Sequence, residues 1–185
     1  SAAAARYDAA AALQQEVANR LLGRLDYIRH QPATVVDLGA GTGYCSERLL
    51  KRYPKSRLLA MDFAEGMLER ARKRGRLLRR PLPVCGDARA LPVADDSVDL
   101  LFSSLMLQWC HPVDEYFGEF NRVLRPGGLL MFSTFGPDTL RELKSAWGEV
   151  DKAVHVHNFL DMHDLGDAMV RSGLADPVVD AERIT

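Results

Sequence analysis

A run of apolar residues that leads into closely spaced glycines is the most informative feature of the chain. The run spans residues 35–38 and contains Asp37, and Gly39, Gly41 and Gly43 follow it. Glycines let the backbone turn sharply and approach a ligand, and the helix expected next presents unpaired N–H groups at its start. The pattern predicts a site for a nucleotide-like ligand; a tight strand-to-helix turn without a ligand is the plain alternative.

The glycine spacing distinguishes between classes of nucleotide. Dinucleotide-binding turns need the spacing G-x-G-x-x-G. Here the spacing is G-x-G-x-G, and Tyr44 occupies the place of the last glycine. We therefore expect a ligand other than a dinucleotide.

Two acidic residues follow later strands and suit a ligand with ribose and adenine groups. Asp62 ends the second expected strand, where its carboxylate can accept hydrogen bonds from both ribose hydroxyls. Asp87 ends the third strand and can accept a hydrogen bond from the adenine amino group. A helix cap at Asp62 and a turn at Asp87 are the structural alternatives, but both acids at the right strand ends favour a binding site.

These residues require a sheet whose strands end side by side. Short, continuously apolar strands alternate with helical patterns, which is typical of an α/β, Rossmann-like fold with a mostly parallel, doubly wound sheet. The expected helices span residues 7–29, 44–53, 65–74 and 113–124, and the expected strands span 35–38, 58–61, 82–85, 98–103 and 129–134.

The pattern changes after the fifth strand. Residues 137–147 begin like a helix, but residues 149–159 have no clean period, so we expect the segment 136–159 to be an insertion of low intrinsic order over the edge of the sheet. Asp161 then resembles a helix N-cap, with a helix to about residue 172. Residues 177–185 resemble one more strand.

Composition favours a single domain. With 185 residues, of which 47% are hydrophobic, the chain can bury a full core over residues 1–185. A net charge of -1 gives no overall attraction to nucleic acid or to an anionic membrane. Cys45, Cys85 and Cys110 lack the spacing of a metal site or a disulfide framework, and no apolar run approaches the roughly 18 residues that span a bilayer. We expect a soluble, cytoplasmic protein.

Four successive motifs carry a resemblance to a known family. VVDLGAGTG, AMDFAEGML, GDARALPVADDSVDLLFSS and LRPGGLLMFST resemble, in order, the motifs of class I S-adenosylmethionine (SAM)-dependent methyltransferases. The resemblance covers essentially the whole chain and implies methyl transfer from SAM, with S-adenosylhomocysteine (SAH) as product. Tyr7 could pack on the cofactor or simply anchor the first helix. The expected cofactor site comprises Asp37, Gly39, Ala40, Gly41, Gly43, Asp62, Phe63, Met67, Asp87, Ala88, Ser103, Tyr7 and Tyr44.

A narrower resemblance rests on other segments. LQWC at 107–110, FSTFGPDTLREL at 132–143, HVHNFLDMHD at 155–164 and the start AAAARYDAAAALQ resemble the malonyl-acyl carrier protein O-methyltransferases of biotin synthesis. This implies methylation of the free malonyl carboxylate, with acyl carrier protein as partner. Members of that family continue beyond residue 185, and we find no pattern for the final antiparallel strand of a class I sheet, so we expect a C-terminally truncated domain.

The substrate side requires donors instead of a base. A carboxylate is already ionised at pH 7, and in-line transfer needs mainly a held nucleophile and excluded water. Surface histidines and a core Trp109 are the alternatives, and no metal site is expected because Asp161, His163 and Asp164 begin a helix and point in different directions. The substrate-orienting candidates are His157, Asn158, His155, Arg141, Lys144, Gln108 and Trp109.

A dense basic run between Arg70 and Arg80 is mostly explained as a solvated helix end; docking of an acidic carrier protein is the functional interpretation.

Two other functions of the protein remain open. One is a different small-molecule methyltransferase, such as a quinone-ring C-methyltransferase, which would need help in deprotonating a ring hydroxyl. The other is a SAM-binding protein without catalysis.

Overall fold

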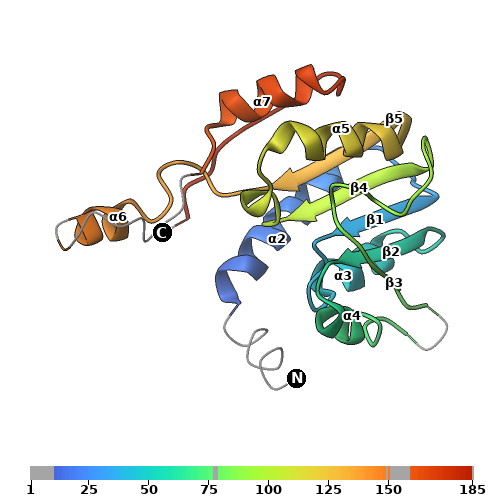
Figure 1. Cartoon of the computed structure of the whole chain (residues 1–185). Coiled ribbons are helices and arrows are strands. Elements are labelled where there is room, and N and C mark those ends of the chain that lie inside the picture. Colours follow the sequence, from blue (N-terminus) through green and yellow to red (C-terminus); the bar gives the residue numbers. More distant parts are fainter. Residues whose placement is uncertain (1–10, 77–78, 149, 151–158, 185) are drawn as a thin grey trace.

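The computed structural model describes residues 11–76, 79–148, 150 and 159–184. Five strands form one parallel sheet in the order β3-β2-β1-β4-β5 (Figure 1). The expected Rossmann-like, doubly wound sheet is therefore confirmed. The strands are β1 (Thr34–Leu38), β2 (Arg57–Asp62), β3 (Leu82–Cys85), β4 (Val98–Ser104) and β5 (Leu124–Ser133).

Helices cover both faces of the sheet, because a parallel sheet is apolar on both sides. On one face α2 (Ala12–Arg24), α3 (Tyr44–Arg52) and α4 (Glu65–Ala71) bury one hydrophobic cluster. On the other face α5 (Val113–Val123) and α7 (Met162–Arg171) bury a second cluster. Two short 3-10 helices complete these layers, η1 (Leu25–Tyr27) and η2 (Leu107–Trp109).

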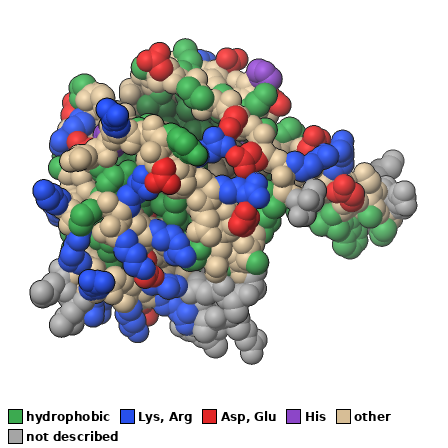
Figure 2. Space-filling view, turned by 180° about the vertical axis from the view of Figure 1, so that it is seen from behind, with side chains coloured by type: hydrophobic (Ala, Val, Ile, Leu, Met, Phe, Trp, Pro, Cys, Tyr) green, Lys and Arg blue, Asp and Glu red, His purple; other side chains and the backbone are tan. Residues whose placement is uncertain are grey.

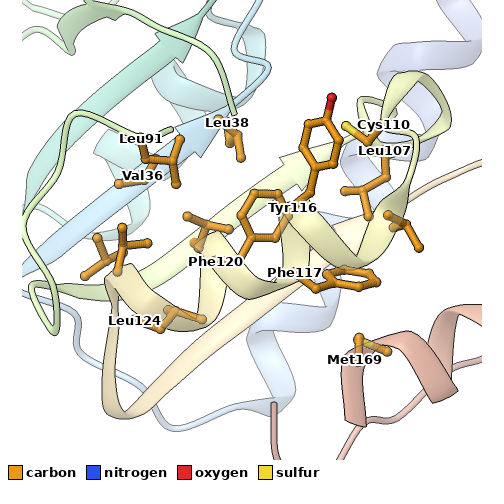
Figure 3. Close-up of a cluster of buried hydrophobic side chains, with 14 of the residues drawn as sticks. Val36, Leu38, Leu91, Leu107, Cys110, Tyr116, Phe117, Phe120, Leu124 and Met169 are labelled. Carbon is orange, nitrogen blue, oxygen red and sulfur yellow. The ribbon is translucent and has the colours of Figure 1, made fainter. Parts of the chain in front are cut away.

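Aromatic residues of α5 fix the central strand from one side. Phe117 and Phe120 are fully buried and meet edge to face, with ring centroids 6.0 Å apart. Figure 3 shows them in one cluster with Val36 and Leu38 of β1. Burial of a Phe side chain contributes about 1.5–3 kcal/mol. This packing holds β1, and hence the turn that follows it, in a defined position.

The order of the strands reverses between β1 and β4. From β1 the chain passes to β2 and β3 on one side, and it returns to place β4 and β5 on the other. Ligands of open α/β sheets bind outside the carboxyl ends of the strands at such a switch point. The turn with the three glycines directly follows β1, so it lies at this place.

The strand expected over residues 177–185 is wrong for the described part of that segment. Residues 177–184 form no strand, and Val178 is 93% exposed. Asp180 and Glu182 pair with the guanidinium groups of Arg20 and Arg24 on α2 instead. A segment with strand-like residues forms a strand only when a neighbouring strand can pair with it, and here charged contacts to a helix replace that pairing.

The insertion after β5 is only partly described. Its helix α6 begins at Arg141 instead of residue 137 and ends at Gly148, and it projects away from the sheet (Figure 1). Leu143 is 44% exposed and Trp147 39%, and Figure 2 shows hydrophobic side chains on the projecting part. The helix expected from Asp161 is confirmed as α7, whose first turn is capped by the Asp161 side chain. In the part of the chain that the structure describes, no helix is long and apolar enough to cross a membrane.

Candidate active site

The glycine turn is tied to the end of the neighbouring strand. The N–H groups of Gly39 and Ala40 both donate to the carbonyl oxygen of Met61 at 2.9 Å, and the Gly43 N–H donates to Ala40 at 2.8 Å. All three glycines have positive φ, at 73°, 52° and 84°. Residues that carry a side chain rarely adopt this backbone conformation. The sequence signal for a sharp, glycine-dependent turn is therefore confirmed.

The three glycines are required for different reasons. A Cβ atom on Gly39 would lie 2.7 Å from the Met106 side chain, and one on Gly43 would lie 2.8 Å from the Cα atom of Ala71 on α4. A Cβ atom on Gly41 would meet no atom within 4 Å. Gly39 and Gly43 thus allow close packing within the protein. Gly41 instead leaves open space beside the backbone, where a ligand can approach.

Asp62 at the end of β2 lies next to this open space. Its Oδ2 accepts a hydrogen bond from the Gly41 N–H at 2.9 Å, and its Oδ1 accepts one from the Ala64 N–H at 2.9 Å. Each carboxylate oxygen can accept a second hydrogen bond. The contact with Ala64 orders the chain just before α4, but Asp62 does not cap this helix, because the N-cap is Ala64 and the helix has no side-chain cap hydrogen bond. Phe63, the next residue, is 85% exposed.

Asp37 lies beneath the turn and is 2% exposed. The Ser46 hydroxyl of α3 donates to its Oδ2. Burial raises the pKa of Asp37 to about 7, and the charge of Asp62 acts in the same direction. Asp37 therefore joins β1 to the start of α3 and supports the turn from below. Sequence reasoning missed Ser46, because no short spacing relates it to Asp37.

Asp87 follows β3 and is held by Arg89. The Arg89 guanidinium donates to both carboxylate oxygens, with the shortest distance of 2.7 Å between Nη2 and Oδ2. These bonds, and the backbone N–H of Arg89, lower the pKa of Asp87. Sequence reasoning missed Arg89, although its position two residues after the acid was a usable signal.

The remaining expected cofactor residues occupy varied places. Met67 on α4 and Ala88 are half-buried. Ser103 near the end of β4 is fully buried, and its hydroxyl has no hydrogen-bond partner. Tyr44 ties α3 to α2, because its hydroxyl donates to Asn19 at 3.0 Å. Tyr7 lies outside the described residues.

On the substrate side, Gln108 and Trp109 follow β4 in η2. The Gln108 Nε2 donates to the carbonyl oxygen of Leu105 at 2.6 Å, while its Oε1 is buried without a partner. Trp109 is 70% exposed, which excludes the interpretation as a core residue. A small cavity of about 10 Å³ adjoins Gln108, and its lining residues are Leu107, Gln108, His111, Thr134, Phe159, Leu160 and Leu165.

Of the substrate-orienting candidates in the insertion 136–159, the structure describes only Arg141 and Lys144. Arg141 lies on the projecting α6, 3.7 Å from Asp138. The Lys144 ammonium lies 5.6 Å from the centre of the Phe159 ring. His155, His157 and Asn158 lie outside the described residues. Among the described residues, no group of three or more His, Cys, Asp and Glu side chains could hold a metal ion.

Only part of the basic run, at Arg76 and Arg79, lies at the edge of the sheet away from the glycine turn. Arg79 donates to the carbonyl oxygen of Tyr53, directly after the end of α3, and its backbone pairs with that of Arg76. Both arginines precede the first residue of β3, so they mark the amino-end edge. Arg74, by contrast, contacts the glycine turn, because its Nε donates to the carbonyl oxygen of Thr42 at 3.1 Å.

The glycine turn, Asp62 and Asp87 all lie in the part of the chain that matches a protein-family model. Residues 36–132 match the model described as "Methyltransferase domain", which is more than half of the chain. The chain belongs to the methyltransferase domain family. The SAM-dependent methyltransferase of Mesorhizobium loti has a similar structure, with a TM-score of 0.65 at 28% identity, covering 82% of this methyltransferase domain and 79% of that chain.

Two curated relatives share higher identity. The malonyl-[acyl-carrier protein] O-methyltransferase of Halorhodospira halophila is 52% identical over 184 residues, which cover 100% of this methyltransferase domain and 62% of the relative. The protein of the same name from Laribacter hongkongensis is 52% identical over 190 residues, covering 98% and 64% respectively. This methyltransferase domain therefore spans somewhat less than two thirds of the length of these relatives.

Proposed function

We propose that the chain binds SAM across the glycine turn and catalyses methyl transfer at the carboxyl edge of the sheet. The observation that carries this proposal is the open space beside Gly41, bordered by the carboxylate of Asp62 at hydrogen-bond distance from the turn. Two acceptors at neighbouring strand ends suit the two hydroxyls and the amino group of an adenosine. The residues present therefore fit the cofactor.

Each residue has a distinct task in this proposal. Asp62 accepts hydrogen bonds from the ribose hydroxyls, and Asp87 faces the adenine amino group. Phe63 offers an exposed aromatic surface for the base. Gly41 lets the backbone lie against the ligand without a side chain in between. Bound SAM would supply an electrophilic methyl group on a sulfonium.

We further propose that the methyl acceptor is the free carboxylate of a malonyl thioester. The names of the two relatives and the sequence segments at 107–110, 132–143 and 155–164 support this substrate. The protein needs no general base, because a carboxylate is ionised at pH 7. Burial raises the pKa of the Cys110 thiol near the site to about 11, so this thiol is protonated and does not compete as a nucleophile.

The segment 136–159 is the proposed substrate cover. It follows β5 and so begins at the edge of the sheet where ligands of this fold bind. His157 and Asn158 are preferred as donors to the substrate, because a tight ion pair with Arg141 would weaken the attacking oxygen. A neutral donor orients one carboxylate oxygen and leaves the other free to attack.

Acyl carrier protein is the proposed bearer of the malonyl group. The names of the relatives support it, whereas the basic run contributes less than its charge suggests. Arg76 and Arg79 lie at the amino-end edge, and the proposed reaction takes place at the carboxyl edge. A carrier that docked on Arg76 and Arg79 would have to reach around the sheet.

Mass spectrometry of the acceptor tests the reaction and the substrate together. The full-length protein is incubated with SAM and malonyl-acyl carrier protein, with malonyl-coenzyme A and acetyl-acyl carrier protein in parallel. The proposal predicts a mass gain of one CH2 on the malonyl carrier and none on the acetyl carrier, which lacks the free carboxylate. Methylation of the acetyl carrier, or no methylation of either malonyl thioester, would contradict it.

A further inference from the structure

One neighbour, Arg89, donates hydrogen bonds to both oxygens of the Asp87 carboxylate. Its Oδ1 accepts hydrogen bonds from the backbone N–H and from Nε of Arg89, at 2.9 and 3.2 Å. Its Oδ2 accepts hydrogen bonds from Nε and Nη2 of Arg89, at 3.1 and 2.7 Å. A carboxylate offers about four lone-pair sites in total. The single Nε–H is shared between both oxygens, so three N–H groups of Arg89 occupy most of these sites and leave Asp87 at most one for a further donor.

A ligand amino group that binds Asp87 must therefore share the carboxylate with Arg89, and it binds best when Arg89 gives up part of this contact. We infer that Arg89 competes with the adenine amino group of the cofactor for Asp87, and so sets both the affinity and the base selectivity of the cofactor site. The inference rests on the proposed function, which places the adenine beside Asp87. It makes Arg89 a positioning residue that weakens cofactor binding.

The contact is built so that it can open. The side chains of Asp87 and Arg89 are 49% and 57% exposed, and water and salt weaken such pairs. The backbone N–H of Arg89 still holds Oδ1 when its side chain leaves, so Asp87 keeps its place. Glu115 and Tyr116 of α5 lie within electrostatic reach of Arg89, and both raise its pKa. Glu115 thus offers the departing guanidinium a second anionic neighbour.

The same competition affects the choice of base. An adenine amino group donates to a carboxylate, whereas the oxygen that replaces it in hypoxanthine accepts and repels the carboxylate. The Arg89 guanidinium can donate to that oxygen. Arg89 therefore disfavours adenine and tolerates hypoxanthine, and its removal sharpens the selectivity for adenine.

Calorimetric titration tests this directly, without reference to activity. SAH and its inosine counterpart, in which oxygen replaces the 6-amino group, are titrated into the wild type, Arg89→Ala and Arg171→Ala. Arg171 is a matched control, because it also pairs through Nε and Nη2 with an aspartate, Asp114, and its side chain is 59% exposed. Loss of Arg171 removes the same charge from a different ion pair, which joins α7 to Asp114 of α5.

We expect Arg89→Ala to bind SAH about two- to fivefold more tightly than the wild type, and to bind the inosine counterpart no more tightly. Arg171→Ala binds both as the wild type does. Added salt strengthens SAH binding by the wild type and changes that of Arg89→Ala little. Weaker SAH binding by Arg89→Ala, or equal gains for both ligands, would overturn the inference while leaving the proposed function intact. A wild type that binds no SAH would overturn the proposed function and the inference together.

Discussion

At the scale of the residue, the glycines of the turn have two different roles: Gly39 allows close packing within the protein, and Gly41 leaves room for a ligand. Both Gly39 and Gly41 have positive φ, where an alanine costs about 1–2 kcal/mol. Only Gly39 has a side chain, that of Met106, within 3 Å of the added Cβ atom, which adds about 1–3 kcal/mol. The Cβ atom of Gly41→Ala enters the open space beside the turn.

We therefore expect Gly39→Ala to lower the free energy of unfolding more than Gly41→Ala does. Gly41→Ala is expected to weaken SAH binding about tenfold or more, because its methyl group occupies the place of the ligand. Urea unfolding and SAH titration of both variants measure the two effects separately. Full SAH affinity in Gly41→Ala would show that the ligand lies elsewhere.

Asp37 predicts a specific dependence of stability on pH. Its pKa is about 7 in the folded chain and lies near 4 in an unfolded one, so the folded state binds more protons between these values. The free energy of unfolding of the wild type should therefore fall as the pH rises from about 4 to about 7, by at most about 4 kcal/mol. Asp37→Asn lacks this titration, and urea unfolding of both proteins without cofactor measures the difference.

Ser46→Ala provides the control for this titration. The Ser46 hydroxyl lowers the pKa of Asp37, so its loss should move the pH-dependent fall to higher pH. An unchanged midpoint in Ser46→Ala, or identical pH profiles of the wild type and Asp37→Asn, would show that Asp37 does not titrate as described.

At the scale of the element, the regular parts were predictable and the segments after β5 were not. The central strands β1 and β4 are short apolar runs that are mostly buried, whereas the edge strands β3 and β5 are largely half-buried or exposed. Apart from β5, which begins at Leu124 instead of residue 129, the strand boundaries lie close to those expected from sequence. The glycine turn and Asp62 follow from the same pattern, because both lie at strand ends. Residues 177–184 resembled a strand in sequence, but within the described part of the chain no strand pairs with them.

The contacts that support the acids escaped prediction for a different reason. Ser46 reaches Asp37 from another element, and only the packing of α3 on β1 brings them together. Arg89 is close to Asp87 in sequence, but many short acid-base spacings make no contact. Sequence patterns identify which residues stand at the ends of strands. Sequence patterns do not identify which side chains donate hydrogen bonds to the acidic residues at these strand ends.

The insertion predicts a separation between binding and turnover. Replacing His157 or Asn158 by Ala should lower turnover of the malonyl substrate, while SAH affinity stays within about twofold, because these donors act on the substrate. His163→Ala is the matched control: this histidine lies on α7, its side chain is 79% exposed, and it contacts Asp161. Steady-state kinetics and SAH titration of the three variants measure both quantities. Parallel loss of SAH binding and turnover in the first two variants would assign the segment to the cofactor site.

At the scale of the whole molecule, the candidate site residues and two of the arginines of the basic run lie at opposite edges of the sheet. The glycine turn, Asp62 and Asp87 lie at the carboxyl ends of the strands, whereas Arg76 and Arg79 lie at the amino ends. The central claim is that the groups of the carboxyl edge form one site for SAM. The claim requires the carboxyl ends of β1, β2 and β3 to lie side by side, and no single sequence motif establishes this arrangement.

Calorimetric competition between SAH and NADH tests this claim most directly. The wild type and Asp62→Ala are titrated with each ligand under the same conditions. The account predicts that the wild type binds SAH in preference to NADH, and that Asp62→Ala loses about 1–3 kcal/mol of SAH affinity, because two ribose hydroxyls lose their acceptor. Unchanged SAH affinity in Asp62→Ala would remove Asp62 from the site, and tighter binding of NADH than of SAH would contradict the account as a whole.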